Sequence, residues 1–322
     1  MADPAQRQTE HVFRIENFRF ANGPPIERLN IAYWTMGRLN AARDNAIFLC
    51  HGASGTRDWA KPFCRTGGAF DPDRWYVISA DMPGGGGSSR PRNEPAFPAS
   101  YGIGDLTAAV AALVEGLEIA SLRAFCGQSM GSLIGLDLAF QRPELVCGLV
   151  LWACGYRCDG YARAVVDALR AVLTLDGSEA GMRAAVAAFL PTLVDRELLA
   201  TMSPSVRVTL VETLAEDWAA NWRADELIAR YTAVAECDLA ARCGGESALA
   251  AAIRCPVLWL PASGDRILPS EQAVTLAKLM PAAAVRLLMT VCGHMAGAAA
   301  PGTPEFSFFD RETAEFLTRL PA

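Results

Sequence analysis

The chain has 322 residues, of which 52% are hydrophobic and 20% charged, and its formal net charge is −6 at pH 7. This apolar fraction excludes a disordered chain, and the acidic balance argues against nucleic acid or an anionic membrane as the main partner. The expected partner is a small molecule. The length allows one large α/β domain or two ordinary ones.

The first residues, MADPAQRQTEH, are polar and charged, without the apolar core of a signal peptide. The most apolar stretch, residues 145–156, is too short to span a bilayer, so we expect a soluble, cytoplasmic protein. The ten cysteines and three histidines form no C-x-x-C or H-x-x-x-H pair. We therefore expect no metal site and no disulfide framework. Four cysteines lie in apolar runs and are expected to be buried: Cys50, Cys126, Cys147 and Cys255.

Short apolar runs alternate with helical patterns along the chain. Residues 12–20 and 28–37 are expected to form an antiparallel pair of strands. The runs at 45–50, 75–80, 122–126, 145–152, 257–260 and 285–291 are typical of central strands in a parallel sheet. Helices are expected at 105–117, 132–141 and 271–279, with a closing amphipathic helix at 311–320. This alternation predicts an α/β fold, with a mostly parallel central sheet flanked by helices.

Residues 158–250 interrupt this alternation, because they are rich in Ala, Leu, Arg and Glu and carry almost no strand signal. Segments such as YARAVVDALRAVL have helical periodicity. We expect an all-helical insertion that divides the core into residues 1–157 and 251–322. The carboxylates of this insertion, Asp217, Asp225 and Glu226, most simply form a solvated face.

The strongest chemical signal is the sequence GQSMG at 127–131, directly after a predicted strand and before a predicted helix. This is the G-x-S-x-G pattern in its strand–turn–helix context. The turn is sharp, so small residues are needed two positions either side of Ser129. It lifts the Ser129 hydroxyl above the sheet at a helix N-terminus, which favours developing negative charge. The alternative is a buried serine in a glycine-rich turn.

A serine hydroxyl is a weak nucleophile and needs a base. His294, in VCGHMAG after the last predicted strand, is the candidate base, and Asp265, in SGDRILP, would orient it. The chain order Ser129, Asp265, His294 is the one expected with this pattern. The interval of 29 residues (294 − 265) leaves room for one helix and one strand. The alternatives are a surface-loop histidine and an aspartate that caps a helix.

An oxyanion hole needs two backbone N–H groups. Met130 follows the nucleophile and would supply one of them. The loop HGASG at 51–55 would supply the other, which we assign to Ala53. His51 is then expected to be a structural histidine, bonded to the backbone, rather than the catalytic base.

The sequence DMPGGGGSS at 81–89 is a glycine-rich turn after another predicted strand. It fits neither G-x-x-x-x-G-K-[ST] nor G-x-G-x-x-G, so we expect no nucleotide and no other cofactor there. We expect the turn to shape one wall near Ser129.

Together the segments HGASG, DMPGGGGSS, GQSMG, GDRILP and GHMAG resemble the α/β-hydrolase superfamily, in the right order from about residue 30 to 294. A closer likeness is to the homoserine O-acetyltransferase group, carried by LNIAYWTMGRLNAARDNAIFLCHGASG and GQSMGSLIGLDLAFQRPE. The resemblance implies an α/β-hydrolase fold, a helical lid over Ser129 and a covalent acyl-Ser129 intermediate. It also implies Asp265 as the orienter and His294 as the base. A homodimer formed through the lid is suggested by the resemblance alone.

The sequence departs from this group at the position after His294, where the transferases usually carry an Asp that helps to bind the amino-acid acceptor. That position is Met295, and an apolar side chain cannot pair with an ammonium group. The glycine pair that follows the methionine of this motif in the group is also reduced here, where Gly131-Ser132 follows Met130. These departures favour related esterases that act on short acyl esters.

We expect the substrate pocket to include Ser54, Met295, Trp218 and Trp222. The two tryptophans lie four residues apart on an expected helix, and the alternative is that they pack the lid on itself or on a partner subunit. The leading hypothesis is a serine hydrolase acting on a small carboxylic ester. Transfer of an acyl group from acyl-CoA to a small alcohol such as homoserine, a non-catalytic binding module, and C–C or lactone hydrolysis stay open.

Overall fold

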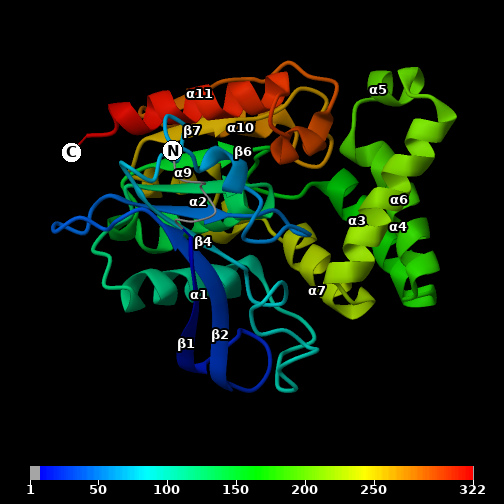
Figure 1. The fold of residues 1–322 in the computed structure, drawn as a ribbon, viewed down its shortest axis with the longest axis horizontal. Coiled ribbons are helices and arrows are strands. Elements are labelled where there is room, and N and C mark those ends of the chain that lie inside the picture. Colours follow the sequence, from blue (N-terminus) through cyan, green and yellow to red (C-terminus); the bar gives the residue numbers. More distant parts are fainter. Residues whose placement is uncertain (1–7, 322) are drawn as a thin grey trace.

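The computed structural model describes residues 8–321, and an eight-stranded sheet lies at its centre (Figure 1). The strands are β1 (Thr9–Phe18), β2 (Ile26–Met36), β3 (Ala46–Cys50), β4 (Tyr76–Ala80), β5 (Ala124–Gln128), β6 (Leu149–Trp152), β7 (Val257–Leu260) and β8 (Ala283–Val285). Their order is β1-β2-β4-β3-β5-β6-β7-β8. The pairs β1–β2 and β2–β4 are antiparallel and the others are parallel, which confirms the predicted mostly parallel sheet.

Both faces of the sheet are covered, because successive side chains of a strand point to opposite faces. In β3, Phe48 and Cys50 face one core, while Ile47 and Leu49 face the other. Helices α1 (Ile103–Gly116), α2 (Met130–Gln141) and α10 (Ser270–Ala277) pack into the first core. Helix α11 (Pro304–Arg319) covers the second, where Phe309 stacks on Trp152 with their ring centroids 4.6 Å apart.

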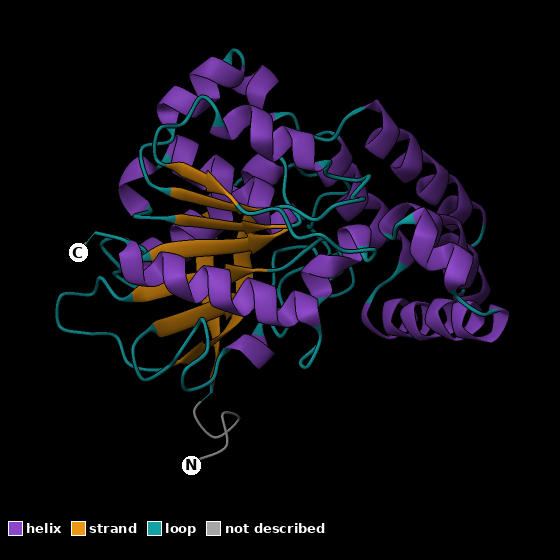
Figure 2. Cartoon of the chain, turned by 90° about the horizontal axis from the view of Figure 1, so that it is seen from above, coloured by secondary structure: helices purple, strands orange, loops and turns teal. Residues whose placement is uncertain are grey.

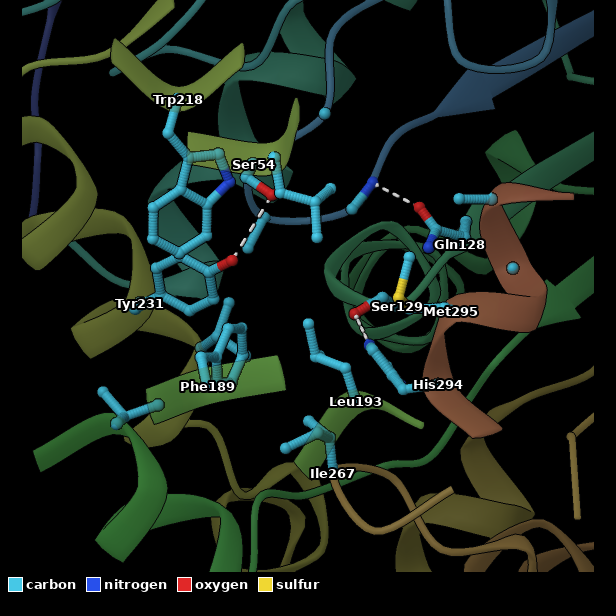
Figure 3. Close-up of a pocket in the computed structure, with 18 of the residues that line it drawn as sticks. Ser54, Gln128, Ser129, Phe189, Leu193, Trp218, Tyr231, Ile267, His294 and Met295 are labelled. Carbon is cyan, nitrogen blue, oxygen red and sulfur yellow. Dashed lines mark hydrogen bonds between the residues drawn. The ribbon is translucent and has the colours of Figure 1, made fainter. Parts of the chain in front are cut away.

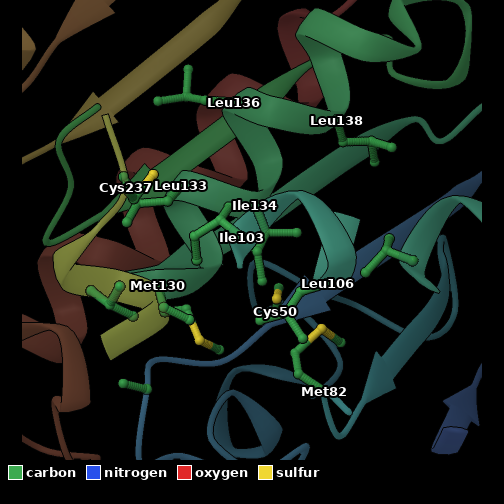
Figure 4. Packing of buried hydrophobic residues seen from close by; sticks show 14 of the residues in the cluster. Cys50, Met82, Ile103, Leu106, Met130, Leu133, Ile134, Leu136, Leu138 and Cys237 are labelled. Atoms are coloured by element: carbon green, nitrogen blue, oxygen red, sulfur yellow. The ribbon is translucent and has the colours of Figure 1, made fainter. Parts of the chain in front are cut away.

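Helix α2 is apolar and buried on almost every side, which suits a helix enclosed by other elements. Figure 4 shows its Leu133 and Ile134 among side chains of α1 and the end of β3. A Cβ at Gly135 would lie 2.6 Å from the ring of Phe125, so this glycine lets α2 lie close against β5. The tight packing fixes the position at which α2 begins.

Between β6 and β7 the described chain is helical. The helices are α3 (Gly160–Leu175), α4 (Glu179–Leu193), α5 (Arg196–Thr201), α6 (Pro204–Asn221), α7 (Ala224–Ala235), α8 (Leu239–Cys243) and α9 (Glu246–Ala252). Each of the helices α3 to α6 begins after an N-cap residue whose side chain accepts a backbone N–H of the first turn. These N-cap residues are Asp159, Ser178, Asp195 and Ser203. Figures 1 and 2 show that α3, α4 and α6 lie beyond the ends of the strands, to one side of the sheet. Residues 160–235 are called the helical segment below.

No helix in residues 8–321 has both the length and the apolar character needed to cross a membrane.

Three expectations about local structure are wrong. The strand expected at 285–291 ends at Val285, and beyond it a single bridge joins Leu288 to Ala262, while Met289 is 76% exposed. The thiol-bearing Cys147 is exposed. Glu226, expected on a solvated face, is buried and accepts two hydrogen bonds from Arg92, at 3.0 and 2.7 Å.

The C-terminal helix α11 begins earlier than predicted. It begins at Pro304, seven residues before the predicted start (311 − 304), and its N-cap Thr303 accepts the N–H of Phe306. Phe306 belongs to the buried cluster on that face, stacked on Phe63 with centroids 4.0 Å apart. The first turn is therefore held by a cap and by packing, which an amphipathic pattern read from residue 311 onward does not include.

Candidate active site

The turn between β5 and α2 holds Ser129 in a strained backbone conformation, with φ 53° and ψ −113°. A Cβ at Gly127 would lie 2.2 Å from the carbonyl oxygen of Gly131, and one at Gly131 would lie 2.2 Å from that of Cys50. Both glycines are therefore required by close backbone contacts, as the motif predicts. The N–H of Ser129 donates to the carbonyl of Trp152 (3.0 Å), which ties the turn to β6.

The structure brings the three predicted side chains together in series. The Ser129 hydroxyl lies 2.8 Å from Nε2 of His294, and Nδ1 of His294 lies 2.8 Å from Oδ2 of Asp265. All three residues are buried. A neutral imidazole whose Nδ1–H donates to the carboxylate leaves the Nε2 lone pair to accept the serine proton. This arrangement can turn the hydroxyl into a nucleophile.

Asp265 and His294 are each held in place by the local structure of the loop that carries them. The other carboxylate oxygen of Asp265 accepts the N–H groups of Ile267 and Leu268, both at 2.9 Å, in the loop before α10. His294 lies in the 3-10 helix η4 (Gly293–Ala298), which Gly293 enters with φ 54°. A Cβ at Gly293 would lie 2.9 Å from the carbonyl of Leu193, so this glycine brings the histidine loop close to α4.

The loop after β3 lies beside Ser129 and is held from two sides. The N–H of Gly52 donates to Oε1 of Gln128 (2.9 Å), and its carbonyl accepts the N–H of Gly55 (3.1 Å) and Nδ1–H of His51 (2.7 Å). Within the described residues, the backbone N–H of Ala53 has no recorded protein acceptor. With the loop held in this way, that N–H is available to a bound ligand.

His51 is a structural histidine by its contacts. Its Nε2 accepts the N–H of Met82 (3.1 Å), so the proton is on Nδ1, which donates to Gly52. Burial lowers the pKa of His51 to about 4, helped by the charge of Arg230 and opposed by Asp81. The ring is therefore neutral at pH 7 and keeps this pair of hydrogen bonds.

A cavity of about 310 Å³ opens at Ser129 (Figure 3). It is lined by Gly52, Ala53, Ser54, Gly55, Trp59, Gln128, Ser129, Cys158, Ala162, Val166, Val186, Phe189, Leu193, Leu214, Asp217, Trp218, Tyr231, Val234, Ile267, His294, Met295, Gly297 and Ala298. Most of these side chains are apolar, and they come both from the sheet and from the helical segment.

Aromatic side chains of the helical segment form one wall of the cavity. Trp218 of α6 and Tyr231 of α7 have ring centroids 5.8 Å apart, and Phe189 of α4 lies 5.5 Å from Tyr231. The Tyr231 hydroxyl donates to the Ser54 hydroxyl (3.3 Å), and burial raises the pKa of Tyr231 to about 12. Figure 3 shows this wall on the opposite side of Ser129 from Met295 and Gln128. Ser54, Trp218 and Met295 thus all line this cavity.

Trp222 does not lie at the cavity, which corrects our expectation. Its ring packs on the glycine-rich turn, where a Cβ at Gly85 would lie 2.3 Å away. Its indole N–H donates to the carbonyl of Ser54 (3.3 Å). Position 222 follows the last residue of α6, so the helical spacing that links it to Trp218 does not give the two side chains the same surroundings.

The glycine-rich turn does not line the cavity either, contrary to our expectation. It folds around Asp81, whose carboxylate accepts the N–H groups of Arg57 (2.7 Å) and Gly87 (2.8 Å) and pairs with the Arg57 guanidinium. A Cβ at Gly86, where φ is 56°, would lie 2.2 Å from that carboxylate carbon. The glycines therefore allow a tight structural turn.

Gln128 and Arg230 are two residues that the sequence motifs do not predict. Gln128 is the first variable position of the G-x-S-x-G motif, and its amide oxygen accepts the N–H of Gly52 in the loop that carries Ala53. Arg230 is fully buried in α7. A signal for it exists in the sequence, since it lies three residues after Leu227 and four before Val234 on an apolar helix face. No group of three or more His, Cys, Asp or Glu side chains in the described chain could hold a metal ion.

A family model described as alpha/beta hydrolase fold matches residues 45–297. The homoserine O-acetyltransferase of Trichormus variabilis is 28% identical over 186 residues, which are 54% of this chain and 52% of that protein. The chain thus spans about half the length of the curated relatives it matches.

Solved structures share the fold across nearly the whole chain. The acetylester hydrolase from Corynebacterium glutamicum has a TM-score of 0.86 at 21% identity and covers 96% of both chains. The homoserine O-acetyltransferase from Bacillus anthracis has a TM-score of 0.85 at 21% identity, with 98% of this chain and 99% of that chain covered.

Proposed function

The chain belongs to the alpha/beta hydrolase family, and from this premise we propose that it is a serine hydrolase that cleaves small carboxylic esters through an acyl-Ser129 intermediate. The observation that carries the proposal is the series of 2.8 Å hydrogen bonds from Ser129 through His294 to Asp265, at the floor of an apolar cavity. A nucleophile, its base and the group that orients the base are the parts that acyl transfer to serine requires.

The chemistry proceeds in two halves. In the first, His294 Nε2 takes the hydroxyl proton while Oγ of Ser129 bonds to the ester carbonyl carbon. The N–H groups of Ala53 and Met130 stabilise the oxyanion. The bond to the alcohol oxygen then breaks, and His294 returns its proton to that oxygen. In the second half, a water attacks the acyl group by the same route and restores Ser129.

The lining of the cavity supports a neutral, largely apolar substrate. No lysine or arginine lines it in the described chain, and its acidic side chain, Asp217, belongs to an exposed residue whose carboxyl pKa is raised by burial. Such a lining offers no partner for the phosphates of a coenzyme A donor. Met295, directly after His294, adds apolar surface to the cavity where it meets the catalytic residues. A short acyl ester with an uncharged alcohol fits these features.

The helical segment is proposed to act as a lid over this site. Its side chains Phe189, Trp218 and Tyr231 form a wall of the cavity that the sheet alone would leave open. Enclosure of the acyl-enzyme limits the nucleophiles that reach it, so the lid also decides between water and another acceptor.

Acyl transfer to a small alcohol is the second candidate, because it uses the same catalytic residues. It is favoured by the curated relatives, among which homoserine O-acetyltransferases are 28% to 34% identical over about half of this chain. The two functions differ in what attacks the acyl-enzyme: water, or an acceptor that the cavity must bind.

Product partitioning separates the two candidates. The protein is incubated with an acetyl ester, or with acetyl-CoA, in the presence and absence of homoserine, and free acetate and O-acetylhomoserine are quantified. Hydrolase activity predicts free acetate from the ester at a rate that homoserine does not change. Acetylated homoserine as the main product would identify a transferase instead. Matched incubations of Ser129→Ala establish the background.

A further inference from the structure

Arg230 is a buried charge that none of the catalytic steps above uses. It is fully enclosed, and no ion pair to a carboxylate is recorded for it within residues 8–321. Its Nε donates to the Tyr101 hydroxyl (2.8 Å), and Nη2 donates to the carbonyls of Met82 (3.1 Å) and Pro83 (2.7 Å). An enclosed guanidinium is costly unless its donors are satisfied. The two bonds of Nη2 are directed at one turn of the backbone, the glycine-rich turn after β4.

The glycine-rich turn is shaped to receive this side chain. A Cβ at Gly84 would lie 2.4 Å from the Tyr101 hydroxyl oxygen and 3.2 Å from Nη2 of Arg230. The guanidinium also lies over the rings of Tyr101 and Trp222, 5.8 and 5.4 Å from their centroids. The lack of a side chain at Gly84, the first glycine of the turn, therefore leaves room for the Tyr101 hydroxyl and the Arg230 guanidinium.

From this turn, hydrogen bonds lead to the loop beside Ser129. The carbonyl of Met82 accepts from Arg230, and the N–H of the same residue donates to Nε2 of His51 (3.1 Å). The opposite ring nitrogen of His51 donates to the carbonyl of Gly52 (2.7 Å). That carbonyl belongs to the same peptide unit as the N–H of Ala53, so its direction sets the direction of this N–H.

We propose that Arg230 is a positioning residue of the oxyanion hole, acting through Met82, His51 and Gly52 on the N–H of Ala53. This inference rests on the proposed acyl-Ser129 chemistry. Arg230 touches no reacting atom. It holds the turn, the turn holds the His51 ring, and the ring holds the peptide whose N–H faces the oxyanion. The other expected donor is the N–H of Met130, the first residue of α2. Nη1 of Arg230 contacts the side-chain sulfur of Met130 at 3.7 Å. Arg230 thereby links the helical segment to both donors.

Two further contacts suit Arg230 to this role. Nη2 of Arg230 donates to two successive carbonyls, those of Met82 and Pro83, and the planar guanidinium fixes the direction of both bonds. Its positive charge disfavours protonation of His51, whose Nε2 must stay an acceptor for the Met82 N–H. The charged groups recorded as acting on this ring are Arg230 and Asp81.

The test compares Arg230→Met and Arg230→Lys with Arg92→Met. Arg92 bonds Glu226 on the same helix, α7, but is outside the hydrogen bonds that lead to Ala53, so it serves as a matched control for loosening of the helix. Active enzyme is counted with a fluorophosphonate, and kcat and KM are measured for one short ester. Inhibition by a trifluoromethyl ketone, whose serine adduct carries an oxyanion, is measured in parallel.

For Arg230→Met we expect kcat per labelled site to fall about 10- to 100-fold with KM within about twofold, since one oxyanion donor is misaligned rather than removed. The inhibition constant of the ketone should weaken by the same factor, a change that a loss of stability alone would not produce. Arg230→Lys keeps the charge but loses the planar guanidinium, which bonds Tyr101 through Nε and the turn through Nη2, so we expect a partial loss, about three- to tenfold. Arg92→Met should keep the kcat of the natural protein.

A kcat and ketone affinity equal to those of the natural protein in Arg230→Met would overturn the inference. If that variant does not fold, Arg230→Lys decides, and an unchanged kcat there would overturn it equally. Equal kcat losses in Arg92→Met and Arg230→Met would assign the effect to helix docking and would also overturn it. A natural protein that neither labels nor turns over an ester would instead reject the proposed function itself.

Discussion

Asp265→Asn should remove most of the activity while leaving the fold intact, for a reason that lies in the hydrogen bonds of this carboxylate. Oδ1 of Asp265 accepts two backbone N–H groups, from Ile267 and Leu268, and Oδ2 accepts Nδ1–H of His294. An asparagine must keep its oxygen toward the two N–H donors, because its NH₂ group cannot accept from them. The NH₂ group is then directed at Nδ1 of the histidine.

The consequence is a change of tautomer. Nδ1 of His294 must become an acceptor, the proton moves to Nε2, and Nε2 can no longer take the proton of Ser129. In a serine protease the same change costs about 10⁴-fold in kcat, which corresponds to about 5 kcal/mol of transition-state stabilisation. We expect a loss of that order here, because the His294 contacts of 2.8 Å on both sides have the same arrangement.

The assay is ester hydrolysis by Asp265→Asn at neutral pH, with ¹⁵N NMR of labelled histidine to identify the protonated ring nitrogen. The natural protein should carry the His294 proton on Nδ1, and the variant on Nε2. Unfolding by urea should show that the variant is folded. Activity within tenfold of the natural protein, or an unchanged tautomer in an inactive variant, would refute the reasoning.

Three other variants test separate parts of the structure. Trp218→Ala should cost about 3–5 kcal/mol of stability and shift kcat/KM toward longer acyl chains, measured with a series of p-nitrophenyl esters; an unchanged chain-length preference would contradict the assigned wall. The pKa of His51 is about 4 in the fold against 6.5 in the unfolded chain, so between these values the proton binds mainly to the unfolded state. The free energy of unfolding therefore decreases as the pH is lowered from 6.5 to 4, by up to about 3 kcal/mol. His51→Gln should reduce this slope in urea titrations from pH 7 to pH 4.5, and an identical slope would argue against a buried neutral ring. Glu226→Gln should lower the free energy of unfolding by about 1–3 kcal/mol, because Arg92 loses its charged partner, and full stability of this variant would mean that the pair contributes nothing.

The residues that could be predicted from the sequence lie where a short motif determines the local backbone geometry. The glycines around Ser129 are required by backbone contacts within the turn itself, so the pattern implies the turn. The order of strands and helices then brings Asp265 and His294 to the same end of the sheet, because both follow strands at its carboxyl edge.

The surroundings that could not be predicted from the sequence are made by contacts between distant parts of the chain. Trp222 and Glu226 look like residues of an isolated helical insertion, but each is buried against the sheet domain, on Gly85 and Arg92. The apolar run at 285–291 has the composition of a central strand, yet β8 is the edge strand and ends at Val285. Beyond it, Arg286 and Leu288 still donate to the carbonyls of Trp259 and Pro261, without forming a regular strand. Composition does not distinguish an edge from the centre of a sheet.

The most direct measurement of the central claim is the site and stoichiometry of covalent labelling by a fluorophosphonate. The account predicts one phosphonate per chain, located by peptide mass spectrometry on Ser129, with ester turnover lost in proportion to labelling. It predicts no adduct in a folded Ser129→Ala. Labelling at another residue, or ester hydrolysis by Ser129→Ala at the rate of the natural protein, would contradict the claim that Ser129 is the nucleophile.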